Sequence, residues 1–308
     1  MGCIRCVPRL NSALLYYFVM ARMQHDPEEV DVFQLERSLW IAEVKLELTS
    51  YDFPFTNIMA CSYSRFGLDE VIAVGRFGAV GDYETLYSGL LDLGVRLIHS
   101  PEQHDRCAEF PLWYPSLEGL TPESWWFDCP PDAETAGRLA GWPLFLKGSR
   151  KTRRHEAKLS IIANEEEYRS AAQAFAEDEM LRSQQAIIRR FERLQSLDVE
   201  MGEKIPASYE FRTFWWRGQF VGAGPYFAAF ARYEWSAGER SEALALAEEA
   251  ARRIDLPFVG IDVAKCRDGR WIIIEINDAQ ECGYTGVQPL PMWQRIVEIE
   301  RARKAEPS

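Results

Sequence analysis

Two acidic side chains near the C-terminal end of the sequence lie in segments that are otherwise apolar. Asp262 occurs in "FVGIDVAK" and Glu275 in "WIIIEIND". Both segments have the composition of buried strands, and the "DG" dipeptide at 268–269 between them is typical of a tight hairpin turn. If those two residues form the turn, Arg267 faces Arg270 and Asp262 lies directly opposite Glu275. Because opposed side chains are about 5 Å apart, the pattern predicts two carboxylates close together among apolar residues.

Two carboxylates in such surroundings must share either a proton or a cation. Asn277 lies two residues beyond Glu275, on the same face of the strand, and Gly260 opposite it leaves room. Oxygens from Asp, Glu and Asn suit Mg²⁺ that is held partly by phosphate oxygens. We therefore predict that Asp262, Glu275 and Asn277 are metal ligands. The alternative is an exposed edge hairpin with hydrated acids, but the run 271–276 lacks the polar alternation of an exposed face.

A cluster of basic residues supplies a candidate site for phosphate. The segment "KGSRKTRRH", 147–155, opens at the end of a predicted strand and includes Lys147 and Lys151. Gly148 and Ser149 permit close approach of a phosphate to the backbone. The Walker pattern is absent, and an exposed basic loop is the alternative. Together with the acid pair, the cluster favours a nucleoside triphosphate.

Two further predicted strands carry buried charges. One is "AIIRRFERL", which holds Arg189 and Arg190, and the other is "YEFRTF", in which Glu210 and Arg212 are two residues apart and share a face. Glu210 and Arg212 can form a purely structural ion pair. Alternatively, Arg212 reaches a terminal phosphate or an acyl phosphate while Glu210 orients it.

The composition excludes several classes of protein. With 47 acidic and 35 basic residues the 308-residue chain has a net charge of −12, which disfavours binding to nucleic acid or to anionic membranes. Its seven cysteines form no disulfide or zinc framework, so a cytoplasmic location is expected. The apolar run 13–21 is too short to span a bilayer, and residues 1–34 are interpreted as an N-terminal extension. The oligomeric state is left open.

The chain between about 35 and 98 predicts a small α/β unit. Strand 70–74, helix 82–92 and strand 95–98 form a βαβ pattern that indicates parallel pairing. Gly75, Gly78 and Gly81 do not have the G-x-G-x-x-G spacing, and no acid ends the next strand, so a dinucleotide site is disfavoured.

Residues 111–141 hold five prolines and three tryptophans and are interpreted as an inter-domain connection. Beyond them, "WPLFLKGS" and "LSIIA" predict strands, and helices are expected over 165–181 and 239–254. Hairpins are expected about Arg217-Gly218 and over 258–277.

The order of these motifs resembles the ATP-grasp superfamily. The segments "PLFLKG", "TRRH", "IIRRF", "YEFRTFWWRGQFVGAGPYF", "DVA" and "IEINDAQ" look most like a clade of small ATP-grasp proteins, rich in arginine at the nucleotide site, from bacteria and their viruses. The resemblance covers roughly 140–290, and residues 35–130 are similar to the small α/β domain that usually precedes this fold. It implies an α/β (α+β) protein with mixed and antiparallel sheets. The implied domains are an extension (1–34), a pre-ATP-grasp-like domain (35–130), an ATP-grasp domain (131–300) and a tail (301–308).

The resemblance also implies roles for individual residues. Lys147 would contact ATP phosphates, Arg212 would stabilise the transferred phosphate, and Asp262, Glu275 and Asn277 would hold one or two Mg²⁺ ions. The remaining candidates for nucleotide contacts are Lys151, Arg189, Arg190, Phe191, Glu192 and Glu210, and those for the acceptor are Asp278, Gln280 and Tyr284. Arg190 stands where many relatives carry an acid, and the usual glycine-rich lid is a basic segment here, so the choice of base and the lid stay open.

The chemistry implied is ATP- and Mg²⁺-dependent ligation of a carboxylate to an amine, or to a thiol, through an acyl phosphate. The partners would be small-molecule or peptide substrates. The four histidines and the absence of G-x-S-x-G and H-E-x-x-H give no sign of a triad or a zinc protease. Two alternatives stay open: an ATP-binding module without catalysis, and a phosphotransferase on the same fold.

Overall fold

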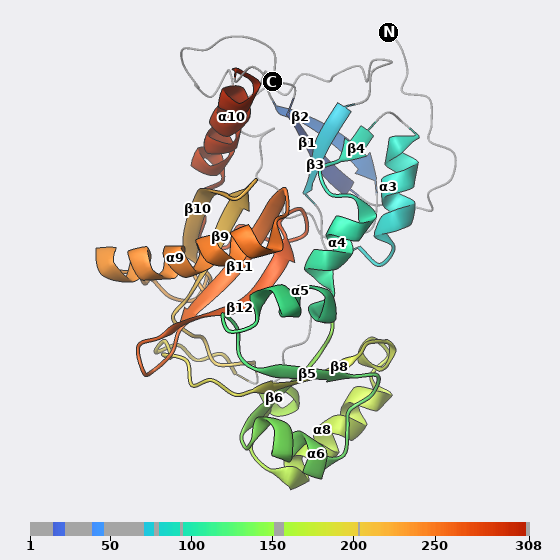
Figure 1. Ribbon diagram of the computed structural model, residues 1–308, viewed down its shortest axis with the longest axis vertical. Coiled ribbons are helices and arrows are strands. Elements are labelled where there is room, and N and C mark those ends of the chain that lie inside the picture. The colour runs from blue at the N-terminus through green and yellow to red at the C-terminus, as the bar shows by residue number, and fades with distance from the viewer. Residues whose placement is uncertain are drawn as a thin grey trace. The chain divides into compact units, whose positions relative to one another are not determined.

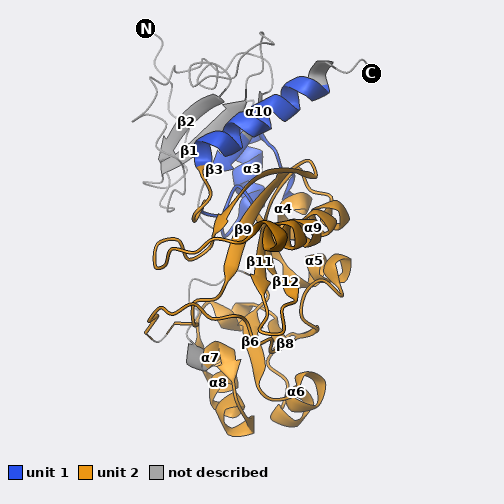
Figure 2. Ribbon diagram, turned by 90° about the vertical axis from the view of Figure 1, so that its left-hand side faces the viewer, with its two compact units in different colours: residues 1–101, 279–283, 289–308 blue, residues 102–278, 284–288 orange. Residues whose placement is uncertain are grey.

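The structure of the chain is a computed structural model, and it describes residues 15–21, 39–45, 71–76, 80–92, 95–150, 157–202 and 204–305. The chain divides into two compact units, shown in different colours in Figure 2. Unit 1 comprises residues 1–101, 279–283 and 289–308, and unit 2 comprises residues 102–278 and 284–288. The sequence-based domain boundaries after 34, 130 and 300 do not coincide with the borders of these units.

Unit 1 contains a four-stranded sheet with the order β2-β1-β3-β4. β1 (Leu15–Ala21) is antiparallel to β2 (Leu39–Lys45) and to β3 (Val71–Arg76), whereas β4 (Val95–Leu97) is parallel to β3. Helix α3 (Tyr83–Leu91) connects β3 to β4 and begins where the Asp82 side chain accepts a hydrogen bond from the Thr85 amide, 3.0 Å. The predicted parallel βαβ pattern is therefore confirmed. Helix α10 (Pro289–Ala305) also belongs to this unit.

Strand β1 lies inside the segment that was expected to be an extension. It pairs with a strand on each side, so at least these residues are part of the sheet. A short apolar run does not by itself distinguish a dispensable segment from a buried strand. Among the described residues, no helix combines the length and the apolar character needed to cross a membrane.

The first sheet of unit 2 is antiparallel and has the order β5-β8-β6-β7. Leu144, Leu146 and Ile188 on one face pack with α6 and α8 in a buried core, and Figure 1 shows both helices beside this sheet. The alternation along β6 therefore turns Lys147 to the opposite face. The bounds are β5 (Ser124–Phe127), α6 (Ala133–Ala140), β6 (Leu144–Gly148), α7 (Ala157–Ser160), β7 (Ile161–Ile162), α8 (Glu165–Glu177), the 3₁₀ helix η1 (Leu181–Ser183) and β8 (Ala186–Arg190).

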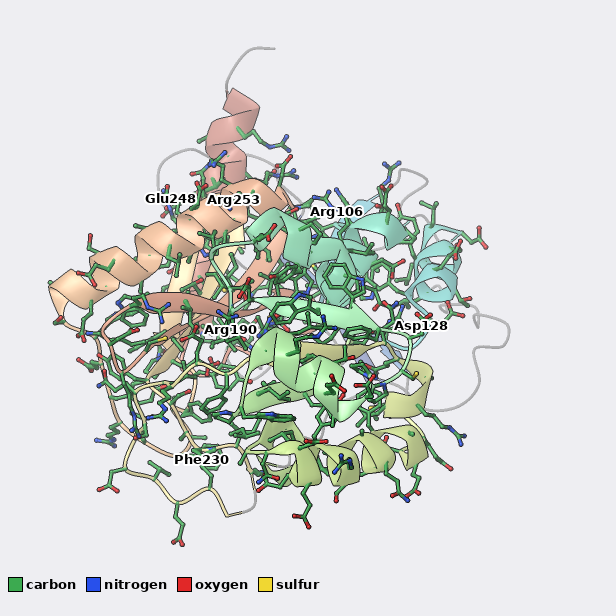
Figure 3. All side chains as sticks on the ribbon, turned by 60° about the horizontal axis from the view of Figure 1, so that its bottom comes forward. Arg106, Asp128, Arg190, Phe230, Glu248 and Arg253 are labelled. Atoms are coloured by element: carbon green, nitrogen blue, oxygen red, sulfur yellow. The ribbon has the colours of Figure 1, made fainter. Side chains whose placement is uncertain are left out.

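The second sheet of unit 2 is also antiparallel and has the order β10-β9-β11-β12. α9 lies across one face of it (Figure 1), and its small buried residues pack on the sheet together with α5. A capping box of Ser236 and Glu239 begins α9, and its C-terminal end accepts a hydrogen bond from Arg106 to the Ile254 carbonyl, 2.6 Å (Figure 3). The bounds are α4 (Pro101–Ala108), α5 (Phe110–Leu117), β9 (Glu210–Trp216), β10 (Gln219–Pro225), α9 (Ala237–Ile254), β11 (Phe258–Lys265) and β12 (Trp271–Asp278).

The proline-rich segment 111–141 is not an inter-domain connection. It contributes most of α5 together with β5 and α6, all within unit 2. Pro111 lies in the first turn of α5, where a missing amide proton is tolerated, and Pro115 lies inside a helix of only two turns. Proline density therefore marked short elements rather than a linker.

The remaining predicted elements agree with the structure. The hairpin β9–β10 turns at Arg217 and Gly218, whose φ angles of 47° and 74° are both left-handed, as a two-residue turn of type I′ requires. Helix α8 begins at the predicted cap, because Asn164 accepts a hydrogen bond from the Glu167 amide, but it ends at Glu177 rather than at 181. The α+β class with mixed and antiparallel sheets is confirmed.

Candidate active site

The predicted pairing of Asp262 with Glu275 is confirmed, as is that of Gly260 with Asn277. The route to it differs from the expectation. The Cys266 amide donates to the Arg270 carbonyl, 2.8 Å, so the turn contains residues 267–269 and Arg267 does not face Arg270. Gly269, with φ +92°, provides the left-handed residue of this longer turn.

A bulge in β12 compensates for the longer turn. Val263 pairs with Ile273, while the next residue, Asp262, pairs with Glu275. Ile274 is therefore an additional residue on β12, and the two one-residue shifts cancel at the carboxylates. Nothing in a uniform run of isoleucines predicts the position of such a bulge.

Each of the two carboxylates is bonded to its own protein cation. Arg212 on β9 lies directly opposite Asp262 and donates two hydrogen bonds to it, each 2.7 Å long. Lys147 on β6 reaches across from the other sheet, and its Nζ is 3.2 Å from Glu275 Oε1. The expectation that the two acids must share one proton or one cation is therefore corrected, because two separate cations balance them.

Asn277 supplies an oxygen that no protein donor satisfies. Its side chain is fully buried, its Nδ2 donates to Asp262 Oδ2 at 3.3 Å, and its Oδ1 has no hydrogen-bond partner. A buried amide oxygen in this state costs about 1–3 kcal/mol. A hard cation would satisfy it, so Asp262, Glu275 and Asn277 fit a metal whose other ligands come from a phosphate. The described part of the chain holds no group of three or more His, Cys, Asp and Glu side chains that could hold a metal without such help.

Glu210 is a buried acid beside this set. Its Oε2 accepts a hydrogen bond from Ser208 Oγ, 3.1 Å. Burial raises its pKa to about 8, and the charge of Asp262 adds to this rise, against the opposing effect of Arg212. Glu210 is therefore protonated at neutral pH in the free protein. The ring of Tyr226 lies 4.9 Å from the guanidinium carbon of Arg212.

Arg189 on β8 is buried, and its described hydrogen bonds are to protein groups. It donates to the Ile274 carbonyl (3.0 Å), to Ser124 Oγ (3.1 Å) and to Thr121 Oγ1 (3.4 Å). Its guanidinium lies 5.1 Å from the ring centre of Phe110, a ring that also lies 5.8 Å from Lys147 Nζ. Burial lowers the pKa of Arg189 to about 10, so the side chain stays charged.

The predicted hinge follows β8. Arg190 is exposed and forms a salt bridge of 2.8 Å with Glu123 (Figure 3), and Glu192 forms one of 3.0 Å with Arg270. Phe191 is half-buried. A cavity of about 360 Å³ lies beside Arg190 and Glu192. Lys151 and the rest of the segment 151–156 lie outside the described residues.

The three predicted acceptor residues have different surroundings. Asp278 is buried, and its Oδ2 is 3.2 Å from His104 Nδ1 of α4. Tyr284 is buried, with its ring 6.1 Å from that of Phe214. Gln280 is in unit 1, where its side chain accepts from the Gly75 amide (2.8 Å) and donates to the Tyr83 hydroxyl (3.0 Å).

Sequence reasoning missed several members of this set, above all His104, Phe110 and Ser208. His104 is 174 positions from its partner Asp278, and a histidine in a short helix gives no local signal of a distant acid. Ser208 lies two residues before Glu210, and the period-2 rule that grouped Glu210 with Arg212 could have included it.

A family model for an ATP-grasp domain, the third family of its clade, matches residues 138–296, just over half of the chain. The chain belongs to this ATP-grasp family. The match spans every strand that carries the carboxylates and cations described above, from β6 to β12.

Solved ATP-grasp structures have a similar fold. D-alanine–D-alanine ligase from Bacillus anthracis matches with a TM-score of 0.51 and 15% identity over 75% of this chain and 80% of that one; the same enzyme complexed with ATP also gives 0.51, with 16% identity over 75% and 79%. A RimK domain ATP-grasp protein from Sphaerobacter thermophilus gives 0.49, with 12% identity over 71% and 77%. At these identities the similarity concerns the fold alone. No protein in the curated set matches the chain in sequence.

The ATP-grasp site of this chain is thus built from two sheets of unit 2. Lys147 and Arg189 come from β6 and β8, and Arg212, Asp262 and Glu275 come from β9, β11 and β12. The arrangement can bind an anion through its cations and a hard cation through its oxygens, with little access of water.

Proposed function

We propose that the chain is an ATP- and Mg²⁺-dependent ligase that joins a carboxylate to an amine, or to a thiol, through an acyl phosphate. The observation that carries the proposal is the buried set in which Arg212 faces Asp262, Lys147 faces Glu275, and Asn277 Oδ1 lacks a donor. Membership of an ATP-grasp family supports it.

In this proposal the two cations bind the phosphates of ATP. Lys147 and Arg212 are held in place by the carboxylates opposite them, so their charges are oriented before the nucleotide arrives. Asp262, Glu275 and Asn277 would hold Mg²⁺, which supplies positive charge that neutralises phosphate oxygens. Arg212 stabilises the charge on the transferred phosphoryl group.

The remaining predicted residues complete the site. The strand end at Arg190, Phe191 and Glu192, with its adjoining cavity, is assigned to the base and ribose. Lys151 and Glu210 are further candidates for nucleotide contacts, and Asp278, Gln280 and Tyr284 are candidates for the acceptor.

The reaction requires positioning rather than a nucleophilic side chain. A carboxylate oxygen of the substrate attacks the γ-phosphorus of ATP, and ADP leaves. The nitrogen of the amine then attacks the acyl carbon, phosphate leaves, and the nitrogen loses a proton. Burial of the charged set excludes water, which would otherwise hydrolyse the acyl phosphate.

The test is ADP release measured against a panel of amino acids and peptides, in the wild type and in Glu275→Gln. We expect Glu275→Gln to fold and to lose Mg²⁺-dependent turnover, because it removes the charge that pairs with Lys147. Glu165→Gln, on the exposed side of α8, is the matched control. Turnover in Glu275→Gln equal to that of the wild type would overturn the assignment. ADP release without bond formation would instead favour a phosphotransferase.

A further inference from the structure

The bulge in β12 determines which residue faces Asp262. On the turn side of the bulge the pairs are Ala264 with Ile272 and Val263 with Ile273. If that register continued, Asp262 would face Ile274 rather than Glu275. The extra residue therefore brings the second carboxylate into position, and whatever stabilises the bulge also stabilises the site.

One side chain from the other sheet bonds to the bulged residue. Arg189 Nη1 donates to the carbonyl of Ile274, 3.0 Å. A bulged residue is left unpaired in the ladder, and here the guanidinium supplies a donor to it. The adjacent carbonyl of Ile273 accepts from Thr121 Oγ1, 3.0 Å, and Thr121 Oγ1 also accepts from Arg189.

Arg189 is itself fixed in place. Its strand β8 pairs with β5 on one side and β6 on the other, its Nε donates to Ser124 Oγ, and its guanidinium lies over the Phe110 ring. Each of its three nitrogens thus has a protein acceptor, and the planar group is held rigidly. This differs from a direct contact with the nucleotide, which the sequence alone led us to expect.

We propose that Arg189 is a positioning residue, which fixes the bulge of β12 through the Ile274 carbonyl and thereby holds Glu275 opposite Asp262. The proposal rests on the proposed function for the role of Glu275. Groups that orient metal ligands typically change metal affinity about 10–100-fold when they are removed, so the effect of Arg189 is directed at Mg²⁺ rather than at the nucleotide itself.

The test compares Arg189→Gln with the wild type in two measurements. The first is hydrogen–deuterium exchange of the peptide 271–278 in the free protein, which we expect to become faster. The second is calorimetric binding of ADP over a range of Mg²⁺ concentrations. We expect the Mg²⁺ concentration for half-maximal effect to rise about tenfold or more, while the affinity for ADP without Mg²⁺ stays that of the wild type.

Three further variants sharpen the result. Arg169→Gln, which replaces an exposed arginine on α8, is the matched control and should change neither measurement. Arg189→Lys keeps the charge but offers a single nitrogen, so it should give intermediate values. Ser124→Ala removes one acceptor of Arg189 and leaves the bond to Ile274, so it should give a smaller change in the same direction.

Several outcomes would overturn the proposal. Weaker ADP binding to the same extent with and without Mg²⁺, and unchanged exchange, would make Arg189 a direct ligand. Faster exchange with an unchanged Mg²⁺ titration would confine Arg189 to stability, and a Mg²⁺ effect without faster exchange would exclude the route through Ile274. Two unchanged measurements would leave Arg189 without this role. If the wild type binds no ADP at any Mg²⁺ concentration, the proposed function fails, and exchange alone decides whether Arg189 holds the bulge.

Discussion

At the scale of single residues, the buried charges of the site balance one another in pairs. Asp262 and Arg212 have side chains only 2% and 6% exposed. Removing one partner of such a pair leaves an uncompensated buried charge, which costs about 3–5 kcal/mol. The stability of the free protein therefore depends on the same contacts as the proposed chemistry.

This dependence can be tested with a double substitution. Arg212→Met should lower the free energy of unfolding by about 3–5 kcal/mol, and Arg212→Met with Asp262→Leu should recover most of the loss, because no charge stays buried alone. Urea unfolding without metal measures both. A single variant as stable as the double variant would contradict this account of the pair.

Glu210 predicts a dependence of stability on pH. Its pKa is raised from the usual 4.5 to about 8 by burial and by Asp262, so between these values the folded chain binds one proton more than the unfolded chain. The free energy of unfolding should therefore fall as pH rises from about 4.5 to 8, by at most about 1.4 kcal/mol per pH unit from this group. Glu210→Gln should lose this part of the slope and be more stable than the wild type at pH 8. Denaturant unfolding at several pH values measures it, and equal slopes for both proteins would exclude the effect.

The sequence predicts part of the site at this scale. Asp262, Glu275 and Asn277 could be grouped because one hairpin brings them together, so the relation between them is local. The partners of these residues could not be predicted. Lys147 is 128 positions from Glu275, and Arg212 is 50 positions from Asp262, and only the pairing of the strands and the approach of the two sheets decide which cation meets which acid.

At the scale of elements, a close crossing of two backbones fixes the end of β10. A Cβ on Gly224 would overlap the backbone of Gly286, while the Gly286 amide donates to the Pro225 carbonyl, 3.0 Å. The loop that carries Tyr284 therefore depends on the absence of a side chain at Gly224.

Gly224→Ala should destabilise the protein by about 1–3 kcal/mol, as overpacking does when the obstacle is backbone. Gly238→Ala is the matched control. That glycine lies in the first turn of α9 with open space around it, so the same substitution should stabilise by up to about 1 kcal/mol. Thermal unfolding compares the two variants. A neutral result at Gly224 would show that the loop shifts at little cost.

Periodicity and turn residues predicted most strands and helices of the described chain, because each of these signals is local. They failed where two local signals interact. The turn at 267–269 and the bulge at Ile274 are each a one-residue departure, and the correct facing of Asp262 and Glu275 was predicted only because they cancel. The segment 111–141 failed differently, since proline is compatible with the first turn of a helix.

At the scale of the whole molecule, the site does not need a metal to keep its charges balanced. EDTA should therefore leave the unfolding temperature unchanged, unlike the case of a structural metal site. ADP with Mg²⁺ at about 100 times its dissociation constant should add about 2.7 kcal/mol to the free energy of unfolding. Scanning fluorimetry in the three conditions measures this, and a lower unfolding temperature in EDTA alone would show that the free protein already holds a structural metal.

The order of motifs along the chain identified the superfamily before any coordinates, because an ATP-grasp fold presents its charged strands in a fixed sequence. The division into units was not accessible in the same way. Residues 279–283 and 289–308 group with the N-terminal part of the chain, and no change of composition marks the points at which the chain leaves one unit and enters the other.

Lys147 and Glu275 belong to different sheets, so the distance between their charged atoms also measures how far apart those sheets stand. A ligand that takes over Lys147 removes this restraint. A pair of spectroscopic labels on the outward faces of α8 and α9 would then report occupation of the site by a change of distance, without any turnover. Candidate ligands can thus be ranked mechanically, before the second substrate is known.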